Sequence, residues 1–410
     1  MQDTDLYRHL LGLETPWTVA SVKLDVKEQT VDVFAEHERG LAWPCPECGI
    51  ESGLHDHAEE RVWRHLDSCQ FRTLLHARPP RVKCPEHGVR QVRLPWAEPH
   101  SRFTALFERL AIDVLRETSV QGACRILRIS WDEAWHILER AVNRGLVRKE
   151  ATVMRYVGID EKSFRKRHRY ASLVCDLDRG VVEYVGEGRN KESVRPFFES
   201  LTDEQRTELQ AVAMDMSGPY ISLATEVLDD AEYRIVFDRF HVMKQMTDSV
   251  DKQRRQEHRQ RLKTGDAALT GSKYLWISNK ENLSDVQRFA FQELKGLELK
   301  TARAWAIKEA LRELWNHHDP AEAILFWKRW YYWATHSRLE HVIDVARSIK
   351  RHLWGVMNYF SFRITNAMSE GMNSVIQTVK QRASGFRNFA NFRTAIYFHC
   401  GGLDLYPATH

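Results

Sequence analysis

The spacing of apolar residues divides the chain into stretches with different periods. Residues 103–146 place apolar side chains at helical intervals, which predicts three helices. From residue 153 short apolar runs appear instead, and they predict the order β-β-β-α-β-α-β-α up to residue 246. From residue 247 to 358 only helical patterns occur. The sequence therefore predicts a helical segment, an α/β domain and an all-α segment, in that order.

The first helical segment has the features of a helix-turn-helix motif. Its middle helix is short, Ala123 is small where two helices would cross, and Ser130 can cap a third helix that begins "WDEAW". Ser130, Trp131 and Trp135 would then begin a recognition helix, with nearby arginines for phosphates: Arg125, Arg128, Arg140 and Arg144. An ordinary three-helix bundle has the same periodicity, so both interpretations stay open. Arg128 stands where a glycine commonly makes the turn.

Three predicted strands are each followed by an acid. Asp160 follows "RYVGI", Asp215 follows "LQAVAM" and Asp238 follows "YRIVF". Adjacent parallel strands bring such ends together, and carboxylates that meet repel one another unless a divalent cation neutralises them. Oxygen ligands favour Mg²⁺ or Mn²⁺. Each acid could instead end its strand or cap the next helix, but three in the same topology favour a metal site.

A short motif, C-P-E-[CH]-G, occurs twice near the N-terminus. Cys45 and Cys48 form one pair, and Cys84 and His87 form the other. Two pairs at this spacing predict a closed, structural Zn²⁺ site in a small β-rich ribbon. Two unrelated proline turns are the alternative. Further possible ligands lie between the pairs without that spacing: His55, His57, His65 and Cys69.

Composition and charge refine this picture. The chain has 410 residues with 43% hydrophobic content, which predicts a folded protein of two to four domains. No apolar run approaches the ~20 residues of a membrane span, and the seven cysteines are scattered, so we expect a cytosolic protein without disulfides. The net charge is only +4, so the molecule as a whole is not a polycation.

Charge is nevertheless concentrated locally. Between Asp344 and Asp404 the only acid is Glu370, among eight lysines and arginines. On a helix, Glu370 shares a face with Asn373, Gln377 and Lys380. A segment that lies along DNA is expected to retain a carboxylate only where a cation intervenes. An ordinary glutamate of a first helical turn explains the position of Glu370 equally well, but not the absence of other acids.

The all-α segment is rich in tryptophan. Its tryptophans include Trp305, Trp315, Trp327, Trp330, Trp333 and Trp354. Their helical spacing and apolar neighbours predict that most are buried, although exposed ones could stack on bases extruded from DNA.

The chain resembles the ISL3 family of insertion-sequence transposases, which are of the DDE type. The matching motifs include "CPECG", "CPEHG", "SWDEAW", "VGIDEKSF", "AVAMDMSGPY", "VFDRFHVMK" and "ITNAMSEGMNSVIQTVKQRASGFRNF". The resemblance implies an RNase H-like catalytic domain that is interrupted by an all-α insertion. It also implies a catalytic triad of Asp160, Asp215 and Glu370 that binds Mg²⁺ or Mn²⁺. Asp238 and His241 match a D-x-x-H signature and are expected to have a supporting role.

With this resemblance, five segments are expected. They are a zinc-binding domain (1–98), a helix-turn-helix domain (99–150), the first part of the RNase H-like domain (151–246), the insertion (247–358) and the final helices with the third acid (359–410). The implied activity is divalent-metal-dependent DNA cleavage and strand transfer at terminal inverted repeats. We expect a homodimer on paired ends of double-stranded DNA, in a bacterial cytoplasm and on the nucleoid when bound. The expected DNA contacts are Arg125, Arg128, Ser130, Trp131, Trp135, Arg140, Lys380, Arg382 and Arg387.

Two other functions fit the same scaffold. One is a DNA-binding regulator without catalysis, which the intact set of acids argues against. The other is an RNase H-like nuclease that cuts DNA without joining it.

Overall fold

The structure is a computed structural model, and it describes residues 2–165, 169–364 and 367–408. The side chains of Lys280 and of residues 367–370 lie outside this description. The chain forms two compact units: residues 1–150 with 397–410, and residues 151–396. None of the described helices has the length and hydrophobicity needed to span a bilayer.

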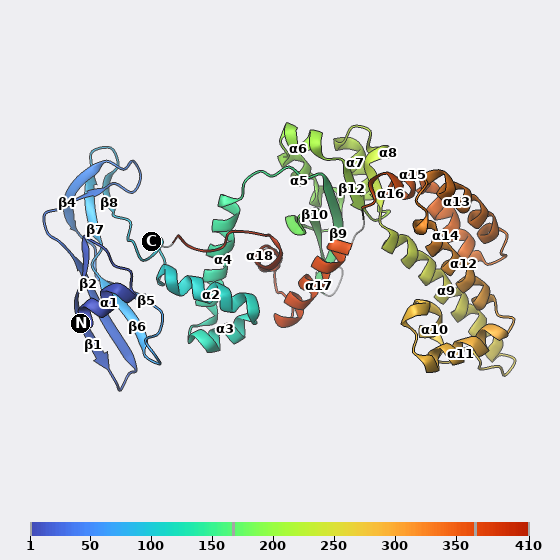
Figure 1. The fold of residues 1–410 in the computed structure, drawn as a ribbon, viewed down its shortest axis with the longest axis horizontal. Helices are drawn as coiled ribbons and strands as arrows, with labels where there is room; N and C mark the ends of the chain where they lie inside the picture. Colours follow the sequence, from blue (N-terminus) through green and yellow to red (C-terminus); the bar gives the residue numbers. More distant parts are fainter. Residues whose placement is uncertain (1, 166–168, 365–366, 409–410) are drawn as a thin grey trace. The chain divides into compact units, whose positions relative to one another are not determined.

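The first unit begins with a helix, α1 (Asp3–Leu10), and two four-stranded sheets (Figure 1). One sheet has the order β1 (Trp17–Asp25), β2 (Thr30–His37), β6 (Arg72–Ala77), β5 (Arg61–Arg64). The other has the order β3 (Ala42–Pro44), β4 (Glu51–His57), β7 (Pro80–Cys84), β8 (Gly88–Gln91). Alternate residues of the strands are buried around four tryptophans, namely Trp17, Trp43, Trp63 and Trp96. The β-rich ribbon predicted from the sequence is confirmed.

Three helices follow in the first unit: α2 (Ala105–Glu117), α3 (Val120–Leu127) and α4 (Trp131–Arg148). Each begins at a capping hydroxyl, and Ser130 forms a complete capping box with Glu133. Arg128 ends α3 in the left-handed conformation, with φ of 56°, where a glycine is the usual residue. The predicted short middle helix, tight turn and cap at Ser130 are therefore confirmed.

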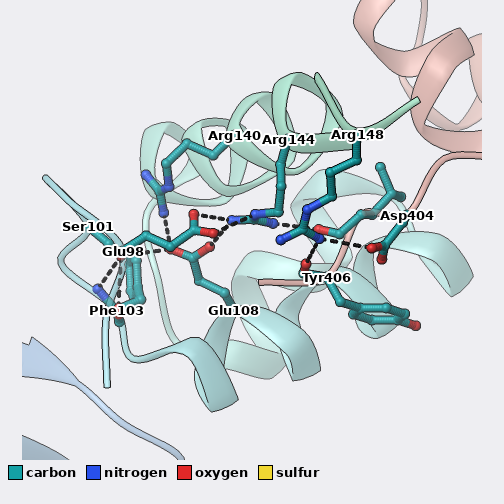
Figure 2. A network of polar contacts seen from close by, with 10 residues as sticks. Glu98, Ser101, Phe103, Glu108, Arg140, Arg144, Arg148, Asp404 and Tyr406 are labelled. Carbon is teal, nitrogen blue, oxygen red and sulfur yellow. Dashed lines mark hydrogen bonds and ion pairs between the residues drawn. The ribbon is translucent and has the colours of Figure 1, made fainter. Parts of the chain in front are cut away.

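The C-terminal tail belongs to the first unit, which differs from the predicted boundary at residue 359. Figure 2 shows Arg144 and Arg148 of α4 directed at this tail and at two glutamates. Arg144 donates to the Leu405 carbonyl, and Arg148 donates to Asp404 at 2.9 Å and to the Tyr406 carbonyl at 2.6 Å. The last residues of the chain thus complete the helical part of the N-terminal unit.

The second unit is built on one five-stranded sheet. Its order is β11 (Val181–Glu187), β10 (Arg169–Asp176), β9 (Tyr156–Arg165), β12 (Ala211–Met214), β13 (Ile235–Phe237). The first three strands are antiparallel, and β12 lies parallel to both β9 and β13. Short helices connect the strands: η1 (Lys191–Ser193), α5 (Arg195–Ser200), α6 (Asp203–Glu208), α7 (Gly218–Val227) and α8 (Ala231–Arg234). This arrangement is the predicted RNase H-like fold.

The insertion is all helical, as predicted. It contains α9 (Arg239–Leu262), α10 (Lys273–Ile277), η2 (Lys280–Asn282), α11 (Asp285–Gly296), α12 (Lys300–Arg312), η3 (Glu313–Asn316), α13 (Pro320–Thr335), α14 (Glu340–Arg351), α15 (Leu353–Met357) and α16 (Tyr359–Phe362). The helix α9 runs through the predicted boundary at residue 247, so the sheet and the insertion share a helix and one continuous core. Five of the seven tryptophans of the insertion are buried, including Trp276, which the sequence did not single out. Trp354 is half-buried, and Trp333 is 45% exposed.

Two helices return the chain to the sheet: α17 (Ala367–Arg382) and α18 (Phe389–Cys400). The side chain of Asn373 on α17 donates to Asp160 of β9, and Lys380 donates to the Ser163 carbonyl at 2.6 Å. On α18, the ring of Phe392 stacks on Phe164 of β9, with ring centroids 5.7 Å apart. These contacts fix the C-terminal helices to the strand that carries the first predicted acid.

Candidate active site and DNA-binding elements

The acids that follow the strands lie next to one another at one edge of the parallel pairs. The register pairs Ala213 with Gly158 and Met214 with Phe237. Continued past these pairs, it places Asp215 between Asp160 and Asp238. The strand β9 does not end at Asp160, as the sequence predicted, but continues to Arg165 because its far half pairs with β10. The strand register nevertheless places the three acids side by side, as the sequence predicted.

Local hydrogen bonds orient the first two carboxylates. Asp160 accepts a hydrogen bond from the Glu161 amide at 2.7 Å through Oδ1, and one from Asn373 through Oδ2. Asp215 accepts one from the Ser217 amide at 3.0 Å. A carboxylate offers about four lone-pair sites, so both acids keep capacity to bind a cation.

Asp238 is held differently. It is the N-cap of α9 and accepts a hydrogen bond from the Phe240 amide at 2.9 Å. Its other oxygen lies 3.0 Å from Nδ1 of His241. This hydrogen bond raises the pKa of His241 against the opposing effect of burial, and the charges of Asp160 and Asp215 raise it further. Asp238 therefore already has two partners, which fits the supporting role predicted for it and His241.

The site has an excess of negative charge. Burial raises the pKa of Asp215, and the charges of Asp160 and Asp238 add to this, while His241 and the Ser217 amide oppose it. A divalent cation at this edge would remove that penalty. The donors are hard carboxylate oxygens, which fit Mg²⁺ or Mn²⁺ and not a soft metal ion.

The third predicted acid, Glu370, lies in α17, but its side chain is outside the described residues. It precedes Asn373 by one helical turn. Of the three residues predicted to share its face, Asn373 and Lys380 contact β9, whereas Gln377 is exposed. The described part of α17 thus brings the predicted face of the helix to the strand that holds Asp160.

The two N-terminal motifs come together as predicted. Cys45, Cys48, Cys84 and His87 have their ligand atoms within 4.8 Å of one another. Cys84 Sγ lies 3.5 Å from Cys48 Sγ and 3.7 Å from Nδ1 of His87. The other ring nitrogen of His87 lies 3.6 Å from Glu47, which is the outer-sphere partner that a metal-binding histidine needs. Three thiols and one imidazole in this arrangement fit a closed tetrahedral Zn²⁺ site.

Electrostatics at the motif act in opposite directions on two of the cysteines. A hydrogen bond from the Ile50 backbone lowers the pKa of Cys48, but burial and the thiols of Cys84 and Cys45 outweigh it and raise that pKa to about 11. Burial opposes the charged form of Cys84, but hydrogen bonds from the backbone and from His87 lower its pKa to about 6. The alternative histidine ligands are engaged elsewhere: Nε2 of His57 lies 2.8 Å from His37, and His65 is hydrogen-bonded to Thr104 at 2.9 Å. His87 is therefore the histidine of the cluster.

Comparison with known proteins decides the family. A transposase model of the ISL3 DDE class matches residues 157–396, a helix-turn-helix model of transposase family ISL3 matches 92–142, and a zinc-finger model of the transposases of IS204, IS1001, IS1096 and IS1165 matches 42–87. The chain belongs to the ISL3 family of transposases. The predicted resemblance is confirmed, and the fold class with it.

Curated relatives of this transposase match along most of their length. The transposase for insertion sequence element IS1001 of Bordetella parapertussis is 29% identical over 350 residues, which cover 84% of this chain and 85% of the relative. The transposase for IS1557 of Mycobacterium tuberculosis H37Rv is 26% identical over 425 residues, with 95% and 93% covered. The chain is thus similar to whole transposases and not to a single domain of them.

Within the helix-turn-helix domain of the transposase, some predicted DNA contacts are accessible. Arg125 is exposed, and Trp131 is 45% exposed at the start of α4. Trp135 is buried beneath Trp131, and the two indoles stack with centroids 5.3 Å apart. Ser130 is exposed and serves as the cap of α4. Trp131 is thus available to DNA, whereas Trp135 supports it from the core.

Two predicted phosphate contacts have partners within the chain instead. Arg128 donates to the Gln70 carbonyl at 3.0 Å and pairs with Asp67. Arg140 pairs with Glu108, which is fully buried between α2 and α4. Arg144, also expected at phosphates, pairs with Glu108 and Glu98 (Figure 2). The guanidinium groups of these residues neutralise buried or nearby carboxylates, which leaves fewer of their N–H donors for phosphates.

The sequence did not single out the partners of these residues. Glu108 lies on the apolar face of α2, among buried residues. A buried acid needs a partner, so its position could have predicted an ion pair with a basic residue. Asn373 was placed on the Glu370 face without a role, and its hydrogen bond to Asp160 was not predicted. Of the basic residues predicted on and after α17, Lys380 is half-buried against β9, and Arg382 and Arg387 are exposed.

Proposed function

We propose that this transposase cuts DNA at the ends of an insertion sequence and joins those ends to target DNA. In this proposal Asp160, Asp215 and Glu370 bind the catalytic Mg²⁺ or Mn²⁺. The observation that supports it most is the register that sets Asp215 beside Asp160, together with the hydrogen bond from Asn373, one turn after Glu370, to Asp160. A protein that only binds phosphates gains nothing from three adjacent carboxylates, two of them half-buried, because each would repel the DNA.

The side chains have separate tasks. Asp160 and Asp215 bind the divalent ions, Asn373 holds the Asp160 carboxylate in one orientation, and Asp238 holds the His241 ring beside the acids. When bound, the divalent ions supply Lewis-acid stabilisation of the attacking and leaving oxygens of an in-line displacement. The Asp238 carboxylate holds His241 through Nδ1, so the ring is fixed toward the site.

Both reactions are displacements at phosphorus and can share these residues. In cleavage, a water oxygen attacks the phosphodiester at the element's end and the 3′-oxygen leaves as a hydroxyl. In strand transfer, that 3′-hydroxyl replaces water and attacks a phosphodiester of the target, whose own 3′-oxygen leaves as a hydroxyl. The proposal needs no covalent protein–DNA intermediate, so it assigns no serine or tyrosine as a nucleophile.

The first unit would recognise the terminal repeats. Its described helix-turn-helix exposes Arg125 just before the recognition helix and Trp131 at the start of that helix. The Cys45, Cys48, Cys84 and His87 cluster joins the turn between β3 and β4 to the turn between β7 and β8. Pairing of two ends requires two such units, which supports a homodimer on paired ends. The substrate places the transposase with bacterial DNA in the cytoplasm.

The test compares Asp160→Ala and Asp215→Ala with the unaltered protein on DNA that contains one element end. Cleavage should need Mg²⁺ or Mn²⁺ and should fall in both variants by more than the about 10- to 100-fold that loss of an outer-sphere partner costs. Asp178→Ala is the matched control, since Asp178 is an exposed acid that pairs with Arg155 at 3.1 Å. If Asp160→Ala cuts as fast as the control, the assignment is wrong.

Two outcomes separate this function from the alternatives. A silent regulator would bind the element end without cutting it under any metal condition. A nuclease would cut it but would not join a pre-cut end with a free 3′-hydroxyl to target DNA. Joining of the pre-cut end that depends on Asp160 excludes both.

A further inference from the structure

A cavity of about 670 Å³ lies between the end of β9 and the turn that joins α17 to α18. Three cations line it, Arg165, Lys380 and Arg387, and none of its described lining residues is an acid. Gln377, Gln381 and Phe386 also line it. The volume falls within the about 300–1,000 Å³ of sites that enclose a small molecule. The lining thus combines positive charge, amides and an aromatic ring, in a cavity large enough for a nucleotide.

The cations keep donors for a phosphate. Lys380 gives one ammonium proton to the Ser163 carbonyl at 2.6 Å, which fixes its position and leaves two. Arg165 gives one N–H to the Arg387 carbonyl at 3.4 Å, which leaves four. Arg387 is exposed. These groups are therefore positioned by the fold, and their remaining donors suit phosphate oxygens.

The other lining groups suit a base. Gln377 and Gln381 are four residues apart on α17, so they lie on one face of the helix, and each amide offers both a donor and an acceptor. Phe386 packs against Phe392, with ring centroids 5.1 Å apart, which holds its ring in place for stacking. Ser384 and Gly385 have φ of 52° and 92°, and this left-handed turn sets Phe386 at the cavity.

The cavity is close to the acids. Asn373 contacts Asp160 and Lys380 lines the cavity, and the two are separated by seven residues of α17, or about 10 Å along the helix. One DNA strand advances about 3.4 Å per nucleotide. A strand whose phosphodiester lies at Asp160 would therefore reach the cavity within about three nucleotides.

We propose that this cavity, defined here as the α17 pocket, holds one nucleotide that is unstacked from the element-end DNA within about three positions of the cut. Its phosphate lies among Lys380, Arg165 and Arg387, its base stacks on Phe386, and Gln377 and Gln381 contact the base edge. This inference rests on the proposed function, and it specifies which nucleotide of the substrate the α17 pocket recognises.

The experiment uses the full chain and a pre-cut element end, so that binding needs no cleavage. A fluorescent adenine analogue that brightens when it leaves the base stack is placed singly at each of the first four positions. The unaltered protein should raise the fluorescence at one position. Phe386→Ala should abolish that rise and weaken binding about 5- to 100-fold, the range found when a base loses an aromatic partner. Phe386→Trp should restore both, which distinguishes stacking from a failure to fold.

Matched variants separate the pocket from general affinity for DNA. Gln377→Ala should reduce the fluorescence rise, whereas Thr378→Ala should not, because Thr378 is exposed on the same helix but does not line the cavity. If Lys380→Ala and Arg387→Ala weaken binding while Phe386→Ala does not, and no position brightens, the cavity is a phosphate contact only and the proposal is overturned.

Failure of the pocket and failure of the proposed function give different results. Cleavage that depends on Asp160, with no position brightening, overturns the pocket and leaves the function intact. Cleavage that is unaffected by Asp160→Ala overturns the function, whatever the fluorescence shows.

Discussion

At the scale of single residues, His65 shows what burial does to a titratable group. Its imidazole is 5% exposed and is hydrogen-bonded to Thr104 at 2.9 Å. Burial and the neighbouring charge of Arg64 lower the pKa of His65 from 6.5 to about 4. The folded protein therefore keeps this histidine neutral at a pH at which the unfolded chain protonates it.

We expect this difference to appear as a loss of stability in mild acid. As the pH falls from 6.5 to 4, His65 becomes protonated in the unfolded chain but stays largely neutral in the folded protein. The free energy of unfolding should therefore fall by about 3 kcal/mol over this range. Chemical denaturation at several pH values measures it. His65→Gln lacks the titration, so its stability should depend less steeply on pH over this range. Equal slopes for the two proteins would contradict the assignment.

The sequence predicted which acids belong to the candidate site, but it did not predict which carboxylates pair with the arginines. Asp160 and Asp215 are marked by the apolar strands before them, which is local information. The partner of Arg140 is Glu108, thirty-two positions earlier, and only the packing of α2 on α4 brings them together. Pairs of this kind depend on tertiary structure, so the phosphate contacts predicted for Arg128 and Arg140 were the least secure part of the site.

At the scale of elements, the close approach of the C-terminal tail to α4 depends on Gly145. A Cβ atom at this position would lie 2.6 Å from Cβ of Leu403 and 3.2 Å from the Asp404 carbonyl. Both contacts are shorter than ordinary van der Waals distances. A glycine in a helix is otherwise unfavourable by about 0.5–1 kcal/mol relative to alanine, so here close packing offsets that cost.

Gly145→Ala should therefore destabilise the first unit by about 1–3 kcal/mol, the usual cost of overpacking, and release the tail. Thermal unfolding and limited proteolysis of the C-terminus measure the two effects. Gly296→Ala is the matched control, because no atom lies within 4 Å of its added Cβ, and it should be neutral or stabilising. Equal stability of the two variants would show that the tail does not lie against α4 in this way.

Element types and caps were predictable, and element lengths were less so. The cap at Ser130 and the left-handed turn at Arg128 follow from short-range chemistry. The extension of β9 to Arg165 follows from its pairing with β10, which the local sequence does not reveal. The same holds for α9, whose polar C-terminal half is stabilised by packing against α12 and α14 and not by its own pattern.

At the scale of the whole molecule, the division into two compact units has a thermodynamic consequence. Residues 1–150 with 397–410 and residues 151–396 each have a core of their own. Separate cores favour separate unfolding transitions. The Cys45, Cys48, Cys84 and His87 cluster lies in only one of these units.

Removal of zinc should therefore affect one transition. A chelator, or Cys48→Ser, should remove about 10 kcal/mol of binding free energy from the folded ribbon and abolish or strongly lower the first unit's transition, while the second unit's transition stays in place. Calorimetry measures both. Cys69→Ser is the control, since Cys69 is exposed and outside the cluster, and it should leave both transitions unchanged. A chelator effect on the second transition would contradict this division.

The order of domains was predictable because each has its own period or motif. The placement of the chain's end was not, because "LDLYPATH" has no pattern that assigns it to the first unit. Contacts with α2 and α4 assign it there, among them those of Arg148 with Asp404 and with the Tyr406 carbonyl and that of the Tyr406 hydroxyl with Asp113.

The central claim is that Glu370 binds the same metal ion as Asp160 and Asp215, and mapping that ion's position on the chain tests it most directly. Fe²⁺ can replace Mg²⁺ at an oxygen site, and with peroxide and ascorbate it cuts the polypeptide close to where it is bound. If Glu370 shares the ion with Asp160 and Asp215, cuts should fall near residues 160, 215 and 370, be competed away by Mg²⁺ and be lost together in Asp160→Ala. Cuts near residues 160 and 215 with none near 370 would contradict it.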